Sequence, residues 1–267
     1  MIKTLKFVFA AVFMAGVAAA LYLASFLFWP NVEELAKKNP ENTAFMEYRE
    51  NQWEREGRNV KIMRTWAPLS EISLYLQKAV VMSEDDAFWS HEGFDYTAIR
   101  SAAQTDIRQR KFKYGASTIT QQLAKNLYLS PSKNPARKAA EAILTRRIEK
   151  ALTKRRILEI YLNIVEWGDG VFGAEAAARH YFGKPASALS PEESARLAII
   201  LPSPLRLNPL NNSGYVPRRA RVMLNAMIKR GDVKAEGDVK DKAEATPEGG
   251  VKVERDVNAE VDIKDSE

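Results

Sequence analysis

A long uncharged stretch is the first pattern in the chain, since no residue from 7 to 29 carries a charge. It consists mostly of Phe, Ala, Val, Leu and Met, and it is long enough to cross, as a helix, a hydrocarbon core of about 30 Å. Lysines precede the stretch within residues 1–6, whereas Glu33 and Glu34 follow it. The positive-inside rule therefore predicts a transmembrane helix over residues 7–29 with a cytoplasmic N-terminus.

A cleaved signal peptide is the alternative, because alanines at positions 18–20 offer a small-residue cleavage site. The apolar sequence continues past them to Trp29, whereas a mature chain normally turns polar after cleavage. In both cases the remainder of the chain lies outside the cytoplasm. That location disfavours ATP-dependent chemistry and DNA or RNA as partners.

Helical spacing dominates the rest of the pattern. Residues 30–66 are polar with scattered aromatic side chains, and we interpret them as a membrane-proximal connector that packs partly on the domain. From residue 67 to 230 apolar positions recur at about 3.6-residue intervals, and no sustained alternation predicts a strand. The predicted helices start at Ser70, at Asp95 with an end near Ile107, at Asn134 with helical spacing to about Asn163, and at Ser190 with an end before Pro202. We therefore expect a mainly α-helical domain.

Charge is distributed unevenly along the chain. Residues 231–267 hold 6 Lys and Arg against 12 Asp and Glu, which leaves 34 against 22 in residues 1–230. The acidic segment has no aromatic residue, and its composition predicts a disordered tail. The basic body indicates an anionic partner, and we interpret its densest basic stretch, residues 146–156, as membrane-facing or solvated.

Composition also limits the chemistry. The chain has no cysteine, which excludes disulfides, thiolate metal sites and a cysteine nucleophile. Only His91 and His180 are present, so a three-histidine metal site is excluded, whereas a Mg²⁺ site with oxygen ligands is not.

The first candidate cluster lies at the end of an apolar helix, where Glu84, Asp85 and Asp86 precede Phe88 and His91. A carboxyl group beside aromatic side chains is partly desolvated, which raises its pKa toward the range of a general acid or base. A solvated helix end with Phe88 in the core would give the same pattern. The sequence alone leaves both interpretations open.

The second cluster, residues 115–126, is a turn of small residues that leads into a predicted helix. On that helix Thr118, Gln122 and Lys125 share a face without acidic residues. Free N–H groups at a helix N-terminus and a lysine two turns along suit an anion such as phosphate. An amphipathic helix with a solvated polar face is the alternative.

The third cluster places Arg137 and Glu141 one helical turn apart. They could form an exposed ion pair worth about 0.3–0.5 kcal/mol. If their face lines a cleft, Glu141 is instead a second carboxylate beside cations.

Two further motif matches are set aside. Residues 168–173 fit the dinucleotide-binding pattern of glycines, but they follow a helical segment in a chain without alternating strands. Residues 130–133 fit the Ser-x-x-Lys pattern of penicillin-binding enzymes, but no Lys-Thr-Gly follows. We interpret the latter as a loop between two helices.

The motifs at residues 84–95, 115–126, 137–141 and 157–163 closely resemble, in this order, those of the peptidoglycan glycosyltransferases, glycosyltransferase family 51. The resemblance covers about residues 65–225 and the N-terminal anchor, and it implies a lysozyme-like domain with a membrane-associated small lobe. No transpeptidase domain accompanies the motifs, which makes the chain similar to the monofunctional members. Asp86 departs from the family pattern, where arginine is common.

The resemblance implies polymerisation of lipid II, in which an acceptor 4-hydroxyl attacks, with inversion, the anomeric carbon of a lipid-diphosphate-linked strand. It makes Glu84 the base and Glu141 a second essential carboxylate, which assists the leaving diphosphate through a metal ion or a basic side chain, or orients the acceptor. Mg²⁺ or Mn²⁺ bridging the diphosphate is left open, with no metal-binding residue assigned. The implied substrate-binding residues are Asp85, Phe88, His91, Ser117, Thr118, Gln122, Lys125, Asn126, Lys133 and Arg137. Among them Lys125 contacts the diphosphate, and Lys133 stands where some relatives have a phosphate-binding arginine.

The implied partners are lipid II, undecaprenyl-diphosphate-linked glycan, the inner membrane, and proteins of cell-wall synthesis or division, with the catalytic domain in the periplasm. One alternative is a lytic transglycosylase or muramidase, which explains Glu84 but neither the anion-binding helix nor Glu141. Another is a membrane-anchored scaffold that binds anionic lipid through its basic face.

Overall fold

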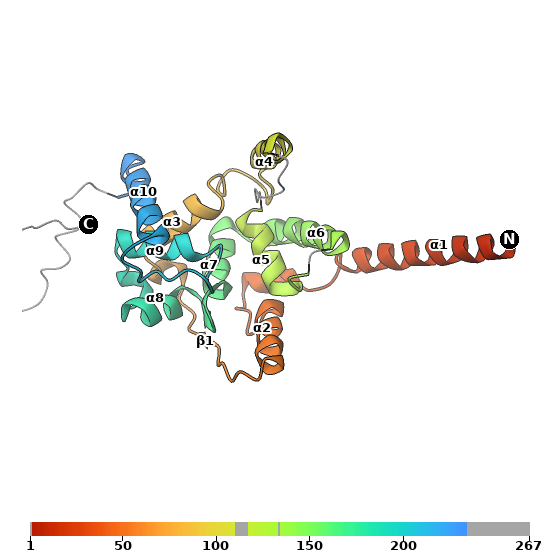
Figure 1. Ribbon diagram of the computed structural model, residues 1–267, viewed down its shortest axis with the longest axis horizontal. Coiled ribbons are helices and arrows are strands. Elements are labelled where there is room, and N and C mark those ends of the chain that lie inside the picture. The colour runs from red at the N-terminus through yellow and green to blue at the C-terminus, as the bar shows by residue number, and fades with distance from the viewer. Residues whose placement is uncertain (1, 110–116, 133, 234–267) are drawn as a thin grey trace, which may run out of the picture. The chain divides into compact units, whose positions relative to one another are not determined.

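The computed structural model of the chain describes residues 2–109, 117–132 and 134–233, and these are mainly helical (Figure 1). Residues 234–267 of the predicted acidic tail, and Lys133, lie outside the described residues. The helices are α1 Ile2–Ser25, α2 Ala44–Arg55, α3 Leu74–Glu84, α4 Tyr96–Gln109, α5 Ile119–Tyr128, α6 Pro135–Ala151, α7 Lys154–Ile164, α8 Ala174–Phe182, α9 Pro191–Ile200 and α10 Tyr215–Lys229. Short 3-10 helices are η1 Val32–Ala36, η2 Leu69–Glu71 and η3 Ala186–Ala188.

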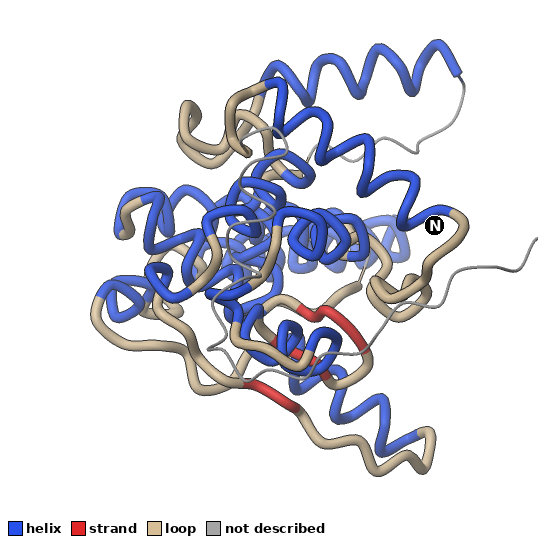
Figure 2. Tube along the Cα trace, turned by 90° about the vertical axis from the view of Figure 1, so that its left-hand side faces the viewer, coloured by secondary structure: helices blue, strands red, loops and turns tan. Residues whose placement is uncertain are grey.

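A small sheet joins the connector to the domain. Its strands are β1 Met63–Arg64, β2 Glu166–Gly168 and β3 Val171–Phe172, in the order β1-β3-β2 (Figure 2). Strand β1 runs parallel to β3 and β2 antiparallel to it. Strands of two or three residues are too short to show alternation in a sequence. The glycine pattern set aside above forms the β2–β3 hairpin.

Three of the predicted helix starts are confirmed. Asp95 precedes α4 and accepts a hydrogen bond of 2.8 Å from the Ala98 N–H. Asn134 caps α6 by accepting a hydrogen bond of 2.6 Å from the Arg137 N–H. Ser190 forms a capping box with Glu193 at the start of α9. These caps satisfy N–H groups that have no partner within the helix.

Two other boundaries differ from the prediction. Ser70 lies in η2, and α3 begins after Ser73. The segment predicted to be helical to Asn163 breaks after Ala151, because the Thr153 hydroxyl accepts a hydrogen bond of 3.3 Å from the Arg156 N–H and starts α7. A capping side chain of this kind competes with continuation of the preceding helix.

Helix α5 lies at the centre of the packing, in contact with α2, α6 and α7, while α3 packs against α9 and α10. Its apolar positions Ile119, Leu123 and Leu127 are buried, as the predicted stripe requires. The largest fully buried side chains of the core include Trp53, Tyr161 and Trp167. Burial of the apolar stripe leaves the face with Gln122 and Lys125 half-buried at the edge of the core.

Two arginines of the predicted membrane-facing basic stretch have a different role. Arg147 Nη1 donates to the Phe26 carbonyl at 3.1 Å, and Arg156 Nε donates to the Leu35 carbonyl at 2.8 Å. Arg156 also donates to the Asn39 side chain at 2.7 Å. The solvated interpretation is wrong for these residues, because their guanidinium groups are mostly buried against backbone carbonyls of the predicted membrane helix for Arg147 and of the connector for Arg156.

Helix α1 exposes large apolar side chains, among them Phe9, Phe13 and Leu21. Among the described residues, none of the helices has both the length and the hydropathy required of a membrane span.

Candidate active site

Glu84 ends helix α3 and faces helix α5. Its Oε2 accepts a hydrogen bond of 2.8 Å from Gln122 Nε2. The side-chain Oε1 of Gln122 in turn accepts a hydrogen bond of 3.0 Å from the Tyr161 hydroxyl. Burial raises the pKa of Glu84, and the Gln122 hydrogen bond and the Lys125 charge oppose that rise. Tyr161 therefore fixes the orientation of the Gln122 amide, which in turn holds one oxygen of the carboxylate.

A second charged group lies one turn beyond Gln122 on the same face. Burial lowers the pKa of Lys125, Glu141 raises it, and the cations Arg137 and Lys138 lower it further. Glu141 is 3% exposed and pairs with Arg137 Nη1 at 2.7 Å and with Lys138 Nζ. The second and third sequence clusters are therefore brought together, with three cations around one buried carboxylate.

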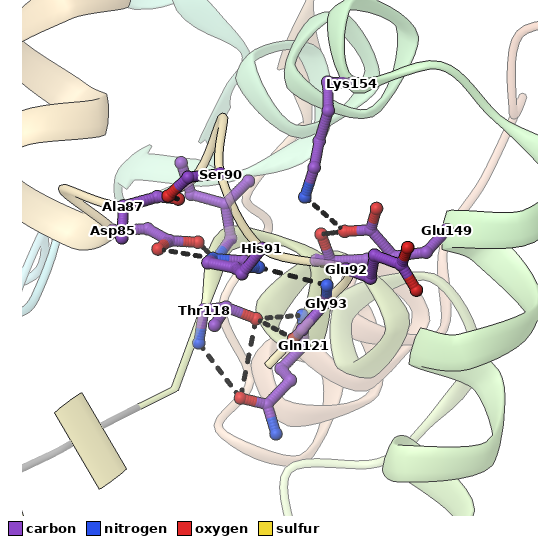
Figure 3. A network of polar contacts seen from close by, with 12 residues as sticks. Asp85, Ala87, Ser90, His91, Glu92, Gly93, Thr118, Gln121, Glu149 and Lys154 are labelled. Atoms are coloured by element: carbon purple, nitrogen blue, oxygen red, sulfur yellow. Dashed lines mark hydrogen bonds and ion pairs between the residues drawn. The ribbon is translucent and has the colours of Figure 1, made fainter. Parts of the chain in front are cut away.

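Asp85 connects the first cluster to the second. Its Oδ1 lies 2.8 Å from His91 Nε2, and its Oδ2 accepts a hydrogen bond of 2.9 Å from the Ile119 N–H at the start of α5. The His91 Nδ1 accepts from the Gly93 N–H at 3.0 Å, so the ring proton lies on Nε2 and is donated to Asp85 (Figure 3). Asp85 thus fixes α5 to the loop that follows Glu84.

Thr118 closes the same network from the other side. Its hydroxyl donates to the Gly93 carbonyl at 2.7 Å and accepts from the Gln121 N–H at 3.2 Å (Figure 3). Gly93 has φ +92°, and a Cβ there would lie 2.8 Å from Cγ2 of Thr145. The position therefore requires glycine for two reasons, the left-handed backbone and the close approach of α6.

The structure corrects the prediction of an anion site at the N-terminus of this helix. The N–H groups of Ile119 and Gln121 are already bonded to Asp85 and Thr118. A protein carboxylate therefore occupies the place assigned to phosphate, and the Lys125 side chain is the cation that α5 presents on its polar face.

Several predicted substrate-binding residues act within the protein instead. Asp85 and Thr118 are buried in the network above, and His91 is half-buried. Phe88 is fully buried, with Lys154 Nζ 4.5 Å from its ring centroid. The contacts of these four residues lie within the protein, and none of the four lines the pocket described next.

A pocket of about 340 Å³ adjoins Gln122 and Lys125. Asn126, which is 6% exposed, also lines it, together with Phe45, Glu166 and the segment 201–206. Ser117 is exposed beside this face and accepts a hydrogen bond of 3.4 Å from Lys138 Nζ. Of the predicted substrate-binding residues, Gln122, Lys125 and Asn126 therefore share one pocket.

The sequence analysis missed Tyr161, Lys138 and Glu166. Lys138 had a usable signal, because it lies three residues before Glu141 on the same helix face. Tyr161 lies in the motif at residues 157–163, but no local pattern indicated its hydrogen bond to Gln122, which is 39 residues away. Glu166 had no signal, since its partner Arg49 is 117 residues away.

The carboxylates were also compared with the needs of a divalent ion. Both oxygens of Glu141 are paired with cations, and both oxygens of Asp85 accept hydrogen bonds. In the part of the chain that the structure describes, no group of three or more His, Cys, Asp or Glu could hold a metal. The described residues therefore do not form a carboxylate cage for Mg²⁺ or Mn²⁺.

Comparisons with known proteins identify the family of the chain. The family model described as Transglycosylase matches residues 51–228. Biosynthetic peptidoglycan transglycosylases are similar to the chain: that of Azoarcus sp. is 52% identical over 166 residues, covering 62% of this chain and 72% of the relative. That of Methylobacillus flagellatus is 41% identical over 214 residues, covering 79% and 93%. The chain belongs to the transglycosylase family.

The Asp85 network generates a first prediction. Asp85→Ala removes a charged hydrogen-bond acceptor from His91 and from the start of α5, so we expect a loss of about 2–4 kcal/mol of unfolding free energy in urea. Asp86→Ala is the matched control, because the neighbouring Asp86 is exposed and pairs with Arg230, and its loss should be about 0–1 kcal/mol. Equal losses in the two variants would contradict the assignment.

Proposed function

We propose that this chain is a peptidoglycan glycosyltransferase of cell-wall synthesis that polymerises lipid II. The observation that carries the proposal is a partly desolvated carboxylate, Glu84, held by Gln122 next to the Lys125 cation. A base and a cation that interact electrostatically match the two needs of the reaction, which are removal of a proton from the nucleophile and positive charge beside the leaving group.

Glu84 is the proposed general base. Its carboxylate removes the proton of the acceptor 4-hydroxyl as the oxygen attacks the anomeric carbon of the donor strand from the side opposite the diphosphate, which inverts that carbon. The bond from carbon to the diphosphate oxygen breaks, and the proton stays on Glu84. The raised pKa of Glu84 makes it a stronger base than a solvated carboxylate.

The cationic group receives the negative charge that develops on the departing diphosphate. We assign Lys125 to the diphosphate itself, with Gln122 and Asn126 as hydrogen-bonding groups of the donor site. Glu141 orients Arg137 and Lys138 toward this side of α5, so its role is to hold cations rather than to touch substrate. Ser117 lies at the edge of this group.

A lytic transglycosylase or muramidase is disfavoured. Its glycan substrate carries no phosphate, and it would leave the cations around Glu141 without a role. The names of the relatives also specify biosynthesis.

Membrane anchoring is part of the proposal. The uncharged run of the sequence extends past the end of α1 to Trp29, and Leu27, Phe28 and Trp29 are exposed. These apolar side chains support a single-pass anchor in the inner membrane, with the catalytic domain in the periplasm. Tyr96 is 76% exposed on α4 and supports a membrane-associated small lobe on a lysozyme-like domain.

Substitution of the base tests the function directly. We expect Glu84→Gln to reduce lipid II polymerisation by about 10²–10⁴-fold, because the amide cannot accept the proton, while binding of lipid II stays within about threefold. Labelled lipid II in detergent, followed by chain length, measures the first quantity and equilibrium binding the second. Glu92→Gln is the control, since Glu92 is exposed in the same loop and pairs with Arg146. Wild-type turnover in Glu84→Gln would exclude it as the base.

The pH profile tests the pairing of base and cation. Polymerisation requires ionised Glu84 and should fall as the pH drops through its raised pKa. Because the Lys125 charge lowers that pKa, Lys125→Met should move the acid limb of kcat/KM to higher pH and reduce the rate. Lys78→Met, which removes an ion pair with Asp232, should leave the limb in place. An acid limb that stays in place in Lys125→Met would contradict the electrostatic interaction of Lys125 with Glu84.

Membrane extraction tests the anchor. The full chain should remain with membranes after carbonate washing, whereas the double variant Phe13→Lys with Val17→Lys should be released, since a lysine at a helix centre costs about 2.5–3.5 kcal/mol of insertion free energy. The control carries leucine at both positions. Retention of the lysine variant would refute anchoring through α1.

A further inference from the structure

The pocket beside Lys125 has a wall that comes from the connector. Phe45 on α2 lines it together with Glu166 on β2, and Leu201 and Pro202 also line it. The family match begins at residue 51, so Phe45 lies ahead of it. Part of the substrate pocket is thus built by residues outside the matched region.

Glu166 is a carboxylate placed in this wall at a cost in solvation. It is 5% exposed, and its Oε1 accepts a hydrogen bond of 2.9 Å from Arg49 Nε. Burial raises the pKa of Glu166, and the Arg49 charge opposes that rise. A buried carboxylate of this kind persists only with a fixed partner, and the partner comes from the connector helix.

Arg49 is itself held rigidly. It is 4% exposed, its Nη1 donates to Gln52 at 2.7 Å and its Nη2 donates to Asp169 at 3.0 Å. Its guanidinium carbon lies 5.1 Å from the ring centroid of Trp53, whose Nε1 donates to the same Asp169 oxygen at 3.1 Å. All three guanidinium nitrogens are engaged, so Arg49 fixes where the Glu166 carboxylate can lie.

Phe45 adds an apolar face to the same wall. Its ring centroid is 6.4 Å from that of Phe172 on β3 and 6.2 Å from that of Tyr48 on α2. With Glu166 as acceptor, the amides of Gln122 and Asn126 and this aromatic ring, the pocket combines directional polar groups with an apolar surface. A sugar ring presents the matching features, hydroxyl or acetamido N–H donors along its edge and C–H groups on its face.

We infer that Glu166 contacts a sugar of the glycan substrate, that Arg49 is its positioning residue, and that helix α2 thereby completes the substrate pocket. The inference rests on the proposed function and deepens it. The Glu166 carboxylate accepts a hydrogen bond from a hydroxyl or acetamido N–H of the sugar next to the reacting bond. Phe45 packs against the face of the same ring.

Steady-state kinetics with lipid II test the contact. Glu166→Gln should raise KM about threefold to tenfold with kcat within about twofold, since one hydrogen bond to substrate is weakened while Glu84 and Lys125 are untouched. Phe45→Leu should raise KM about twofold to tenfold, because it removes the aromatic face at nearly constant volume. An unchanged KM in both variants would overturn the inference.

The positioning role needs its own readout. Arg49→Met should raise KM, Arg49→Lys should restore part of the loss, and Glu166→Gln added to Arg49→Met should raise KM no further. Arg156→Met is the matched control, because Arg156 also ties the connector to the domain but does not line the pocket. The KM of Arg156→Met should equal that of the wild type. If its KM rose as much as that of Arg49→Met, Arg49 would act only by stabilising the connector.

The proposed function and the inference about Glu166 can be refuted separately. A wild-type chain that does not polymerise lipid II refutes the proposed function. A wild-type chain that polymerises while Glu166→Gln keeps its KM refutes only the role of Glu166.

Discussion

The Asp85 carboxylate is the contact on which the site depends. One oxygen accepts a hydrogen bond from His91, and the other accepts one from the Ile119 N–H at the start of helix α5. Both Gln122 and Lys125 lie on that helix, and Glu84 precedes Asp85 by one residue. The same carboxylate therefore sets the distance between Glu84, the proposed base, and the Lys125 cation, which must be fixed closely for the two to act on one substrate.

Burial of charge shapes the rest of the site. Glu141 is nearly inaccessible and is compensated by Arg137 and Lys138, and Glu166 is compensated by Arg49. Burial of a charged group without a partner would cost several kcal/mol of folding free energy, so each of these carboxylates is paired with a cation from another turn or element. The arrangement makes the pocket polar and rigid before any substrate enters.

Local signals in the sequence were sufficient to predict several helix boundaries and the buried face of helix α5. The caps at Asn134 and Ser190 and the buried stripe of α5 follow from side chains within one or two turns, and these predictions are confirmed. The helix break before Thr153 was missed, because apolar residues keep helical spacing on both sides of it and hide the capping role of the threonine. The anion site predicted at the start of α5 was wrong, because Asp85 already accepts a hydrogen bond from the Ile119 N–H. The sequence did not indicate this contact, since the two residues are thirty-four positions apart.

The sequence by itself determined the helical class, the family resemblance, and the residue types of a base, a second carboxylate and a lysine, because these depend on short-range periodicity and ordered motifs. Only the tertiary structure decided which of them face the pocket. Phe88 and Thr118 point into the core, whereas Glu166 and Phe45 reach the pocket from a hairpin and from the connector. Such contacts join distant segments and depend on packing, which no local pattern encodes.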